Sequence, residues 1–215
     1  MYKICSLCIL FCHVVSVPVF AQQKSRLGIK TGVNVAWQTN SMYGIQPGAV
    51  IAMHVTGFTE VQVAKRFFVQ PGISLQGKGV STDAGDQQEM ADGRVNMMYL
   101  EIPINLLYKF NLPNLTKLVV GGGPYAGLGL NGKERNGSPN VFRGIAGTDG
   151  FTNTDFGFNL IVGTELKSRF SLSLQQSIGM DNVAPAGHRF AGSEGQSYLA
   201  DIKNRVSSVS IGYRF

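Results

Sequence analysis

Apolar residues alternate with other residues along most of the chain. From 98 to 110 every even-numbered position is apolar, whereas the odd-numbered positions include Glu101, Asn105 and Lys109. The stretch 209–215 repeats this pattern. A period of two residues is typical of β-strands, because successive side chains of a strand point to opposite faces. The chain is therefore expected to be all-β.

The alternation predicts about eight strands, and their connectors differ in length. The predicted strands cover 27–37, 46–63, 66–79, 97–110, 117–130, 154–166, 169–180 and the segment after 203. Hairpin turns of two to four residues join the second to the third strand, the fourth to the fifth and the sixth to the seventh. The other connectors are long and rich in Gly, Asn, Asp and Ser. This plan predicts an eight-stranded antiparallel up-and-down transmembrane β-barrel with short periplasmic turns and long extracellular loops.

The residues between the apolar positions indicate which face meets lipid. A dry protein core does not accommodate polar and charged side chains unless they are paired. In a barrel with its apolar face toward lipid, these side chains face a polar lumen. We therefore predict a lumenal polar network made of Lys30, His54, Lys78, Glu101, Lys109 and Glu165. Alternation alone also fits the inverse arrangement, a soluble periplasmic lipocalin-like barrel that binds a small apolar ligand.

Aromatic residues near the strand ends predict two belts at the membrane interfaces. The belt at the short-turn end is expected to hold Tyr108, Phe110, Phe170, Tyr213 and Phe215. The belt toward the long-loop end is expected to hold Trp37, Tyr99, Phe156 and Phe158. Tyr213 and Phe215 are also predicted to form a C-terminal assembly signal that the barrel-assembly machinery recognises.

Residues 1–21 have the pattern of a secretory signal peptide. Lys3 precedes an apolar run over 4–20, and cleavage is expected after Ala21. The barrel domain is then 22–215. All three cysteines, at positions 5, 8 and 12, lie in the signal, so the processed chain is expected to have no disulfide. No second apolar run reaches the roughly 18 residues of a transmembrane helix, and the predicted location is the outer membrane.

The basic charge is modest and unevenly placed. The chain has 19 Lys and Arg against 13 Asp and Glu, a net charge of +6, but it lacks the dense basic run of a nucleic-acid binder. Nine basic residues fall at the predicted short-turn end, among them Lys24, Arg26, Lys109 and Arg214. The other five form a predicted periplasmic basic rim, consisting of Lys65, Arg66, Lys117, Lys167 and Arg169. Such a rim is expected to attract anionic lipid head groups.

Four segments resemble the PorT-like outer-membrane β-barrel family of Bacteroidetes-type bacteria. They are 68–79 (FVQPGISLQGKG), 99–104 (YLEIPI), 123–127 (GPYAG) and 210–215 (SIGYRF). The resemblance implies an eight-stranded outer-membrane barrel with both termini in the periplasm. Some members of this family serve protein secretion and gliding. The family usually shows a Glu after the Gln-Pro pair, where this chain has Gly72.

Motifs that would indicate catalysis or metal binding are weak. The segment 127–133 (GLGLNGK) matches most of a phosphate-binding loop, but Glu134 replaces the Ser or Thr that holds magnesium, and no helix is expected to follow. The histidines outside the signal, His54 and His188, belong to no recognised catalytic spacing and cannot form an ordinary zinc site without cysteine. The acidic residues of the 83–92 loop are expected to be solvated rather than bound to calcium. No enzymatic activity, cofactor or metal is predicted.

The leading functional hypothesis is a non-enzymatic outer-membrane barrel with a structural or adaptor-like role. An eight-stranded barrel is only wide enough to be filled by its own side chains, which argues against a wide porin channel. A narrow outer-membrane pore or transporter is an alternative. The expected partners are outer-membrane lipid and the barrel-assembly machinery, and a cell-surface or secretion-system protein is a further candidate. No nucleic-acid partner is expected.

Overall fold

The computed structural model describes residues 25–39, 47–82, 93–112, 116–134, 141–142, 150–166, 168–184, 189–191, 197–199 and 201–215. Structural statements below concern these residues. Within them, no helix is long and apolar enough to cross a membrane.

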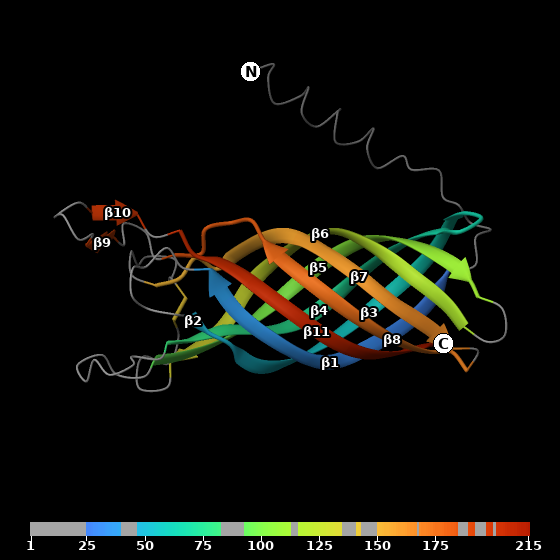
Figure 1. Cartoon of the computed structure of the whole chain (residues 1–215), viewed down its shortest axis with the longest axis horizontal. Helices are drawn as coiled ribbons and strands as arrows, with labels where there is room; N and C mark the ends of the chain where they lie inside the picture. The colour runs from blue at the N-terminus through green and yellow to red at the C-terminus, as the bar shows by residue number, and fades with distance from the viewer. Residues whose placement is uncertain are drawn as a thin grey trace, which may run out of the picture.

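Eight long strands close into an antiparallel barrel (Figure 1). These strands are β1 (Arg26–Thr39), β3 (Val50–Ala64), β4 (Phe67–Thr82), β5 (Gly93–Asn111), β6 (Thr116–Glu134), β7 (Thr154–Leu166), β8 (Phe170–Gly179) and β11 (Lys203–Arg214). Each strand pairs with the next long strand along the chain, and pairing of β1 with β11 closes the ring. The predicted eight-stranded up-and-down barrel is confirmed.

Connections of different length lie at opposite ends of the barrel (Figure 1). The turn between β3 and β4 consists of Lys65 and Arg66, and the β5–β6 and β7–β8 connections are also short. At the other end lie the long connections and three short strands: β2 (Pro47–Gly48), β9 (Arg189–Ala191) and β10 (Ser197–Leu199). β2 falls within the predicted strand 46–63, whereas the alternation did not predict β9 and β10. We call these the short-turn end and the long-loop end.

The strands reach further toward the long-loop end than the apolar alternation predicts. β5 begins at Gly93 instead of 97, and β6 continues to Glu134 instead of 130. Backbone pairing between β5 and β6 continues through the pair Val95–Glu134, although this segment lacks the alternation. A β-bulge also interrupts β6, because Met98 pairs with Asn131 and Tyr99 with Gly129, which leaves Leu130 without a partner. Hydrogen bonding between neighbouring strands therefore extends beyond the segment in which apolar residues alternate.

The apolar face of the barrel points outward. On β3 the outward-facing Ile51 and Met53 are 70% and 69% exposed, whereas the neighbouring His54 is 5% exposed. The same alternation of exposed apolar and buried polar residues continues on β5, β7 and β11. A soluble lipocalin-like barrel needs an apolar interior, so the polar interior contradicts that alternative.

Aromatic rings gather on the outer surface at the short-turn end. Tyr108 lies edge-on between Phe67 and Phe110, with ring centroids 4.9 and 4.6 Å away. A second group joins Phe170, Tyr213 and Phe215.

At the long-loop end Phe156 and Phe158 are exposed, but the placement of Tyr99 in the outer belt is wrong. Tyr99 is 0% exposed, because the odd-numbered residues of β5 face the lumen. The reason lies in the pleat of the strand, which fixes the direction of a side chain regardless of its type.

Candidate functional site in the barrel lumen

The lumen contains two groups of buried charges, and the first surrounds Lys78. Its ammonium group lies 2.5 Å from Glu101 Oε1 and 2.6 Å from Asp155 Oδ2. The three side chains come from β4, β5 and β7 and are at most 2% exposed. Asn204 Nδ2 of β11 donates a further hydrogen bond of 3.0 Å to Asp155 Oδ2. We call these residues, together with Tyr99 and Tyr125, the Lys78 cluster.

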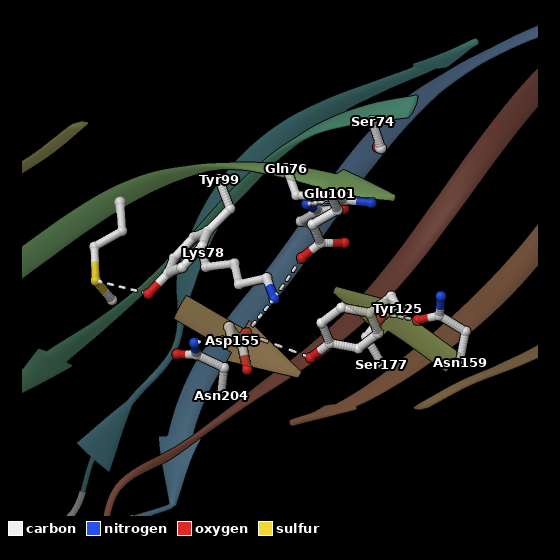
Figure 2. A network of polar contacts seen from close by, with 12 residues as sticks. Ser74, Gln76, Lys78, Tyr99, Glu101, Tyr125, Asp155, Asn159, Ser177 and Asn204 are labelled. Atoms are coloured by element: carbon white, nitrogen blue, oxygen red, sulfur yellow. Dashed lines mark hydrogen bonds and ion pairs between the residues drawn. The ribbon is translucent and has the colours of Figure 1, made fainter. Parts of the chain in front are cut away.

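Two aromatic rings complete the Lys78 cluster (Figure 2). The Lys78 ammonium lies 5.0 Å from the Tyr99 ring centroid and 4.6 Å from that of Tyr125, distances at which a ring face attracts a cation. The Tyr125 hydroxyl also donates to Asp155 Oδ2 over 3.4 Å. Gly157 leaves room for this ring, because a Cβ there would lie 2.6 Å from the Tyr125 hydroxyl oxygen. The cation is thus enclosed by two carboxylates and two rings.

The second group of buried charges lies closer to the short-turn end. Lys109 of β5 forms ion pairs with Glu60 of β3, at 2.6 Å, and with Glu165 of β7. Arg214 of β11 lies 2.9 Å from Glu165 Oε2 and 3.6 Å from Glu60 Oε1. The Lys109 ammonium also lies 4.3 Å from the ring centroid of Phe68. We call Lys109, Arg214, Glu60 and Glu165 the Lys109 cluster.

A chain of hydrogen bonds surrounds His54. The Asn34 amide donates to Gln76 Oε1 over 2.8 Å, so Asn34 Oδ1 is the acceptor toward His54 Nδ1 at 2.7 Å. The other ring nitrogen, Nε2, then accepts from Ser210 Oγ at 2.9 Å in the neutral ring. A serine, a histidine and an amide in this order resemble a catalytic triad. However, all three are at most 5% exposed, so solvent does not deliver a substrate to the hydroxyl.

Lys30 is the one cation of the predicted network that, within the described residues, pairs with no carboxylate. Its ammonium donates to Gln175 Oε1 over 3.2 Å. It lines a cavity of about 50 Å³ that Glu165, Gln70 and Ser173 also border. This cavity is large enough for water, which needs about 10–15 Å³.

The structure places all six predicted network residues inside the barrel but not in one network. Lys78 and Glu101 belong to one cluster, Lys109 and Glu165 to the other, and Lys30 and His54 make separate hydrogen bonds. Among the described lumenal side chains, four cations face four carboxylates, so the formal charges balance: Lys30, Lys78, Lys109 and Arg214 against Glu60, Glu101, Asp155 and Glu165.

The predicted network omitted Glu60, Asp155, Tyr125 and Arg214. Strand parity already directs Glu60 and Asp155 toward the lumen in the sequence, and the same parity could have found Tyr125 and Arg214, which also face inward. Arg214 was instead assigned to the basic short-turn end, and Lys109 was assigned both to that end and to the network. Both residues lie near that end, but their side chains are only 11% and 3% exposed, because both pair with buried carboxylates.

The described members of the predicted basic rim are solvent-exposed at the short-turn end. Lys65 and Arg66 form the β3–β4 turn, Lys117 lies near the start of β6, and Arg169 precedes β8 with a φ of 69°. Arg66 Nη1 donates to the Tyr108 hydroxyl over 3.2 Å. Lys167 lies outside the described residues.

Several other predictions also fall outside the described residues: the signal peptide over 1–21, Lys24, the acidic 83–92 loop and His188. The segment that resembles a phosphate-binding loop lies within strand β6. Its Gly129 packs against Phe142, since a Cβ there would lie 2.5 Å from Cε1 of that ring. Among the described residues no group of three or more His, Cys, Asp or Glu side chains could hold a metal ion.

Gly72 occupies the position where the resembling family usually has Glu. It faces the lumen on β4, and a Cβ at this position would lie 2.9 Å from the carbonyl oxygen of Gly57. The backbone therefore approaches too closely for an acidic side chain, and the lumenal carboxylates come from other strands.

One solved structure supports this architecture. The chain is similar to the outer membrane protein OprG from Pseudomonas aeruginosa, with a TM-score of 0.53, 10% identity, and coverage of 90% of this chain and 97% of that one. Neisserial surface protein A gives a TM-score of 0.47 at 8% identity, covering 88% and 97% of the two chains. Ail of Yersinia pestis gives 0.45 at 11% identity, covering 89% and 99%. At such identities the likeness concerns the fold alone.

Sequence comparison gives the family. None of the curated proteins matches this sequence. The family model described as "Outer membrane protein beta-barrel domain" matches residues 20–184, which is most of the chain and includes seven of the eight long strands. This chain therefore belongs to the outer membrane protein beta-barrel domain family, whose members are small β-barrels of the bacterial outer membrane.

Proposed function

We propose that this protein is a non-enzymatic, structural or adaptor-like barrel whose lumen is closed by its own charged side chains. The observation that supports this proposal is the pair of buried clusters around Lys78 and Lys109. They bring charged side chains from five strands into the lumen, where, together with Lys30, cations and carboxylates balance. Because an isolated buried charge is costly, such clusters persist only while their members remain paired. The lumen thus serves stability rather than passage of a solute.

Conductance of the purified protein in planar bilayers tests the closed lumen. The wild-type barrel is expected to give no stable large conductance. The triple variant Lys78→Ser, Glu101→Ser and Asp155→Ser removes three buried side chains together with their charges and is expected to leak small ions. Stable large conductance of the wild type would overturn the proposal.

The 50 Å³ cavity beside Lys30 favours a second candidate function, a narrow pore. This cavity lies between the two clusters and borders Glu165, so a rearrangement of the Lys109 cluster could connect it to the short-turn end. Small, discrete wild-type currents that Lys30→Met abolishes would favour the pore, and unchanged currents would exclude this route.

An adaptor role is supported by the grouping of the long connections at one end and by the resemblance to PorT-like barrels. In outer-membrane barrels the long loops face the cell exterior. Replacing 143–149 by a Gly-Ser sequence of equal length should therefore reduce crosslinking to a cell-surface or secretion partner while the barrel still shows heat-modifiable mobility. Replacing the β5–β6 turn over 113–115 is the matched control, and equal loss in both variants would contradict an adaptor role of the loops.

The basic rim belongs to the same proposal as a contact with anionic lipid of the periplasmic leaflet. Its exposed cations lie at the end that faces the periplasm in barrels of this type. Replacing Lys65, Arg66, Lys167 and Arg169 by Gln should slow insertion into anionic vesicles more than into neutral ones. Equal effects on both kinds of vesicle would refute the lipid contact.

A further inference from the structure

A pocket of about 170 Å³ opens at the short-turn end, and most of its lining is basic. Its basic residues are Arg26, Lys65, Arg66, Lys109 and Lys117, and Glu60 is its one acidic residue. Gln62, Asn111 and Phe68 complete the lining. The formal charge of this lining is therefore +4. We call this feature the mouth pocket.

Four cations of the mouth pocket have no carboxylate partner within the described residues. Glu60 lies directly opposite Arg26 in the β1–β3 register, but its carboxylate pairs with Lys109 and lies near Arg214. Arg26 is consequently left exposed without an ion pair. Lys65, Arg66 and Lys117 are likewise exposed and, in this part of the chain, unpaired. Because Glu60 pairs with Lys109 in the buried Lys109 cluster, its negative charge does not neutralise the exposed cations of the mouth pocket.

The strand register directs two of these cations, Arg26 and Lys117, toward the barrel axis rather than toward lipid. Arg26 continues the inward-facing even positions of β1, and Lys117 continues the inward-facing odd positions of β6. Arg66 is held by its hydrogen bond to the Tyr108 hydroxyl, and its backbone carbonyl accepts from the Lys109 amide at 3.0 Å. Arg169 belongs to the same end of the barrel but does not line the pocket. The basic rim is therefore not uniform, because part of it converges on one concavity.

The shape and charge of the mouth pocket suit a phosphate group. The space of 170 Å³ is more than ten times the roughly 10–15 Å³ that one water requires by the same measure. Arginine binds the oxygens of a phosphate through two parallel hydrogen bonds, and lysine adds a compact point charge. A group with several anionic oxygens can contact cations from β1, the β3–β4 turn and β6 together, whereas a single carboxylate has only two oxygens.

We propose that the mouth pocket is a binding site for a phosphate monoester or free phosphate on the periplasmic side of the barrel. The phosphate comes either from a lipid head group or from a soluble phosphate. The site deepens the proposed function, since it uses part of the basic rim, but it requires neither a closed lumen nor an adaptor role. Its binding is measured in detergent, so a failure here is distinguishable from a failure of the bilayer and vesicle experiments.

The test is a titration of the full-length processed barrel in dodecyl maltoside micelles, which contain no phosphorus, followed by phosphorus NMR. One arm uses inorganic phosphate and the other dihexanoyl phosphatidic acid, both at constant ionic strength set with chloride. The double variant Arg26→Gln and Lys117→Gln is expected to weaken binding in the effective arm at least tenfold. The matched control, Arg169→Gln and Lys133→Gln, removes the same charge outside the pocket and should stay within twofold of wild type. Heat-modifiable mobility confirms that each variant is folded.

The outcomes separate the two sources of phosphate. Binding of phosphatidic acid at least tenfold tighter than inorganic phosphate assigns the site to a lipid head group, and comparable binding assigns it to soluble phosphate. Equal weakening by the pocket and control variants would overturn the proposal in favour of diffuse attraction by net charge. Absence of saturable binding in both arms would overturn it as well.

Discussion

Each of the two charged clusters of the lumen pairs two buried carboxylates with cations, but the number of cations differs between them. In the Lys78 cluster one cation serves two carboxylates, and these three side chains are at most 2% exposed. In the Lys109 cluster two cations serve two carboxylates, and exposure rises to 11% at Arg214. Loss of Lys78 leaves Glu101 and Asp155 without a cation within ion-pair distance in the described part of the chain, whereas loss of Lys109 leaves Arg214 beside Glu165.

This difference follows from position along the barrel axis. Near the short-turn end, the Lys109 cluster borders the exposed cations of the mouth pocket, and exposure rises to 7% at Glu165 and 11% at Arg214. Around Lys78, the rings of Tyr99 and Tyr125 exclude water, and the interaction of each charge with its neighbours is correspondingly stronger. The comparison predicts that the deeper cluster is the more sensitive to the loss of one member.

The largest expected effect is that of Lys78→Met. The substitution leaves two buried carboxylates unpaired and should lower the free energy of unfolding by about 3–5 kcal/mol. Urea unfolding of the barrel in phosphatidylcholine vesicles, followed by the fluorescence of Trp37, measures this loss.

The control for Lys78→Met adds Glu101→Gln and Asp155→Asn in the same chain. Removing both negative charges should recover most of the lost stability, because neutral amides are less costly to bury than unpaired carboxylates. If the free energy of unfolding of Lys78→Met alone lies within about 1 kcal/mol of the wild-type value, the charges of the cluster are not electrostatically coupled.

Lys109→Met should cost less, about 1–3 kcal/mol, because Arg214 remains to pair with Glu165. The same unfolding assay measures it. Combining Lys109→Met with Arg214→Met should bring the loss up to that of Lys78→Met. If Lys109→Met alone is the more damaging of the two single lysine variants, the argument from redundancy is wrong.

Tyr125→Phe tests the hydrogen bond at the edge of the Lys78 cluster. It removes the hydroxyl that donates to Asp155 but keeps the ring, so a loss of about 0.5–1.5 kcal/mol is expected. Tyr99→Phe is the matched control, since that hydroxyl donates to the sulfur of Met97 at 3.8 Å and interacts with the neutral Asn204 rather than donating to a carboxylate, so its removal should cost less. A larger loss of stability for Tyr99→Phe would show that the hydrogen bond from Tyr125 to Asp155 is not the more important of the two hydroxyl contacts.

The smallest effect is expected for Arg169→Gly, which changes neither cluster directly. Arg169 has a φ of 69°, a conformation that glycine adopts more readily, so the variant should gain about 0.5–1 kcal/mol. The Arg169 carbonyl that accepts from the Arg214 amide is retained. Thermal unfolding in detergent measures the gain, and a loss of stability would indicate that the Arg169 side chain has a structural role.

Much of the fold could be predicted from the sequence because a lipid-facing barrel repeats one simple pattern. The alternation over 98–110 correctly directs Glu101 and Lys109 inward, and the connector lengths correctly separate the two ends. Tyr99 was misplaced because a general preference of aromatic residues for interfaces was applied against strand parity. The extensions of β5 and β6 were missed because they depend on pairing between strands rather than on apolar residues.

The candidate site was harder to predict from the sequence, because strand parity gives the direction of a side chain but not its partners. Lys78, Glu101 and Asp155 lie on three strands and meet only once the register of β4, β5, β6 and β7 is set. Likewise, Arg26 and Glu60 lie opposite each other in the β1–β3 register, yet Glu60 pairs with Lys109 across the lumen.

The sequence by itself determined the eight long strands, the division of their side chains between an apolar and a polar face, and the concentration of basic residues at one end. These properties are local, since they follow from the two-residue period and from the lengths of the connectors. Only the tertiary structure decided that the polar face points inward, that the inward charges divide into two clusters and that, among the described residues, four cations around one pocket have no carboxylate partner. Closure of the barrel brings residues from distant parts of the chain to the same height, and electrostatic pairing in a narrow lumen depends on that height.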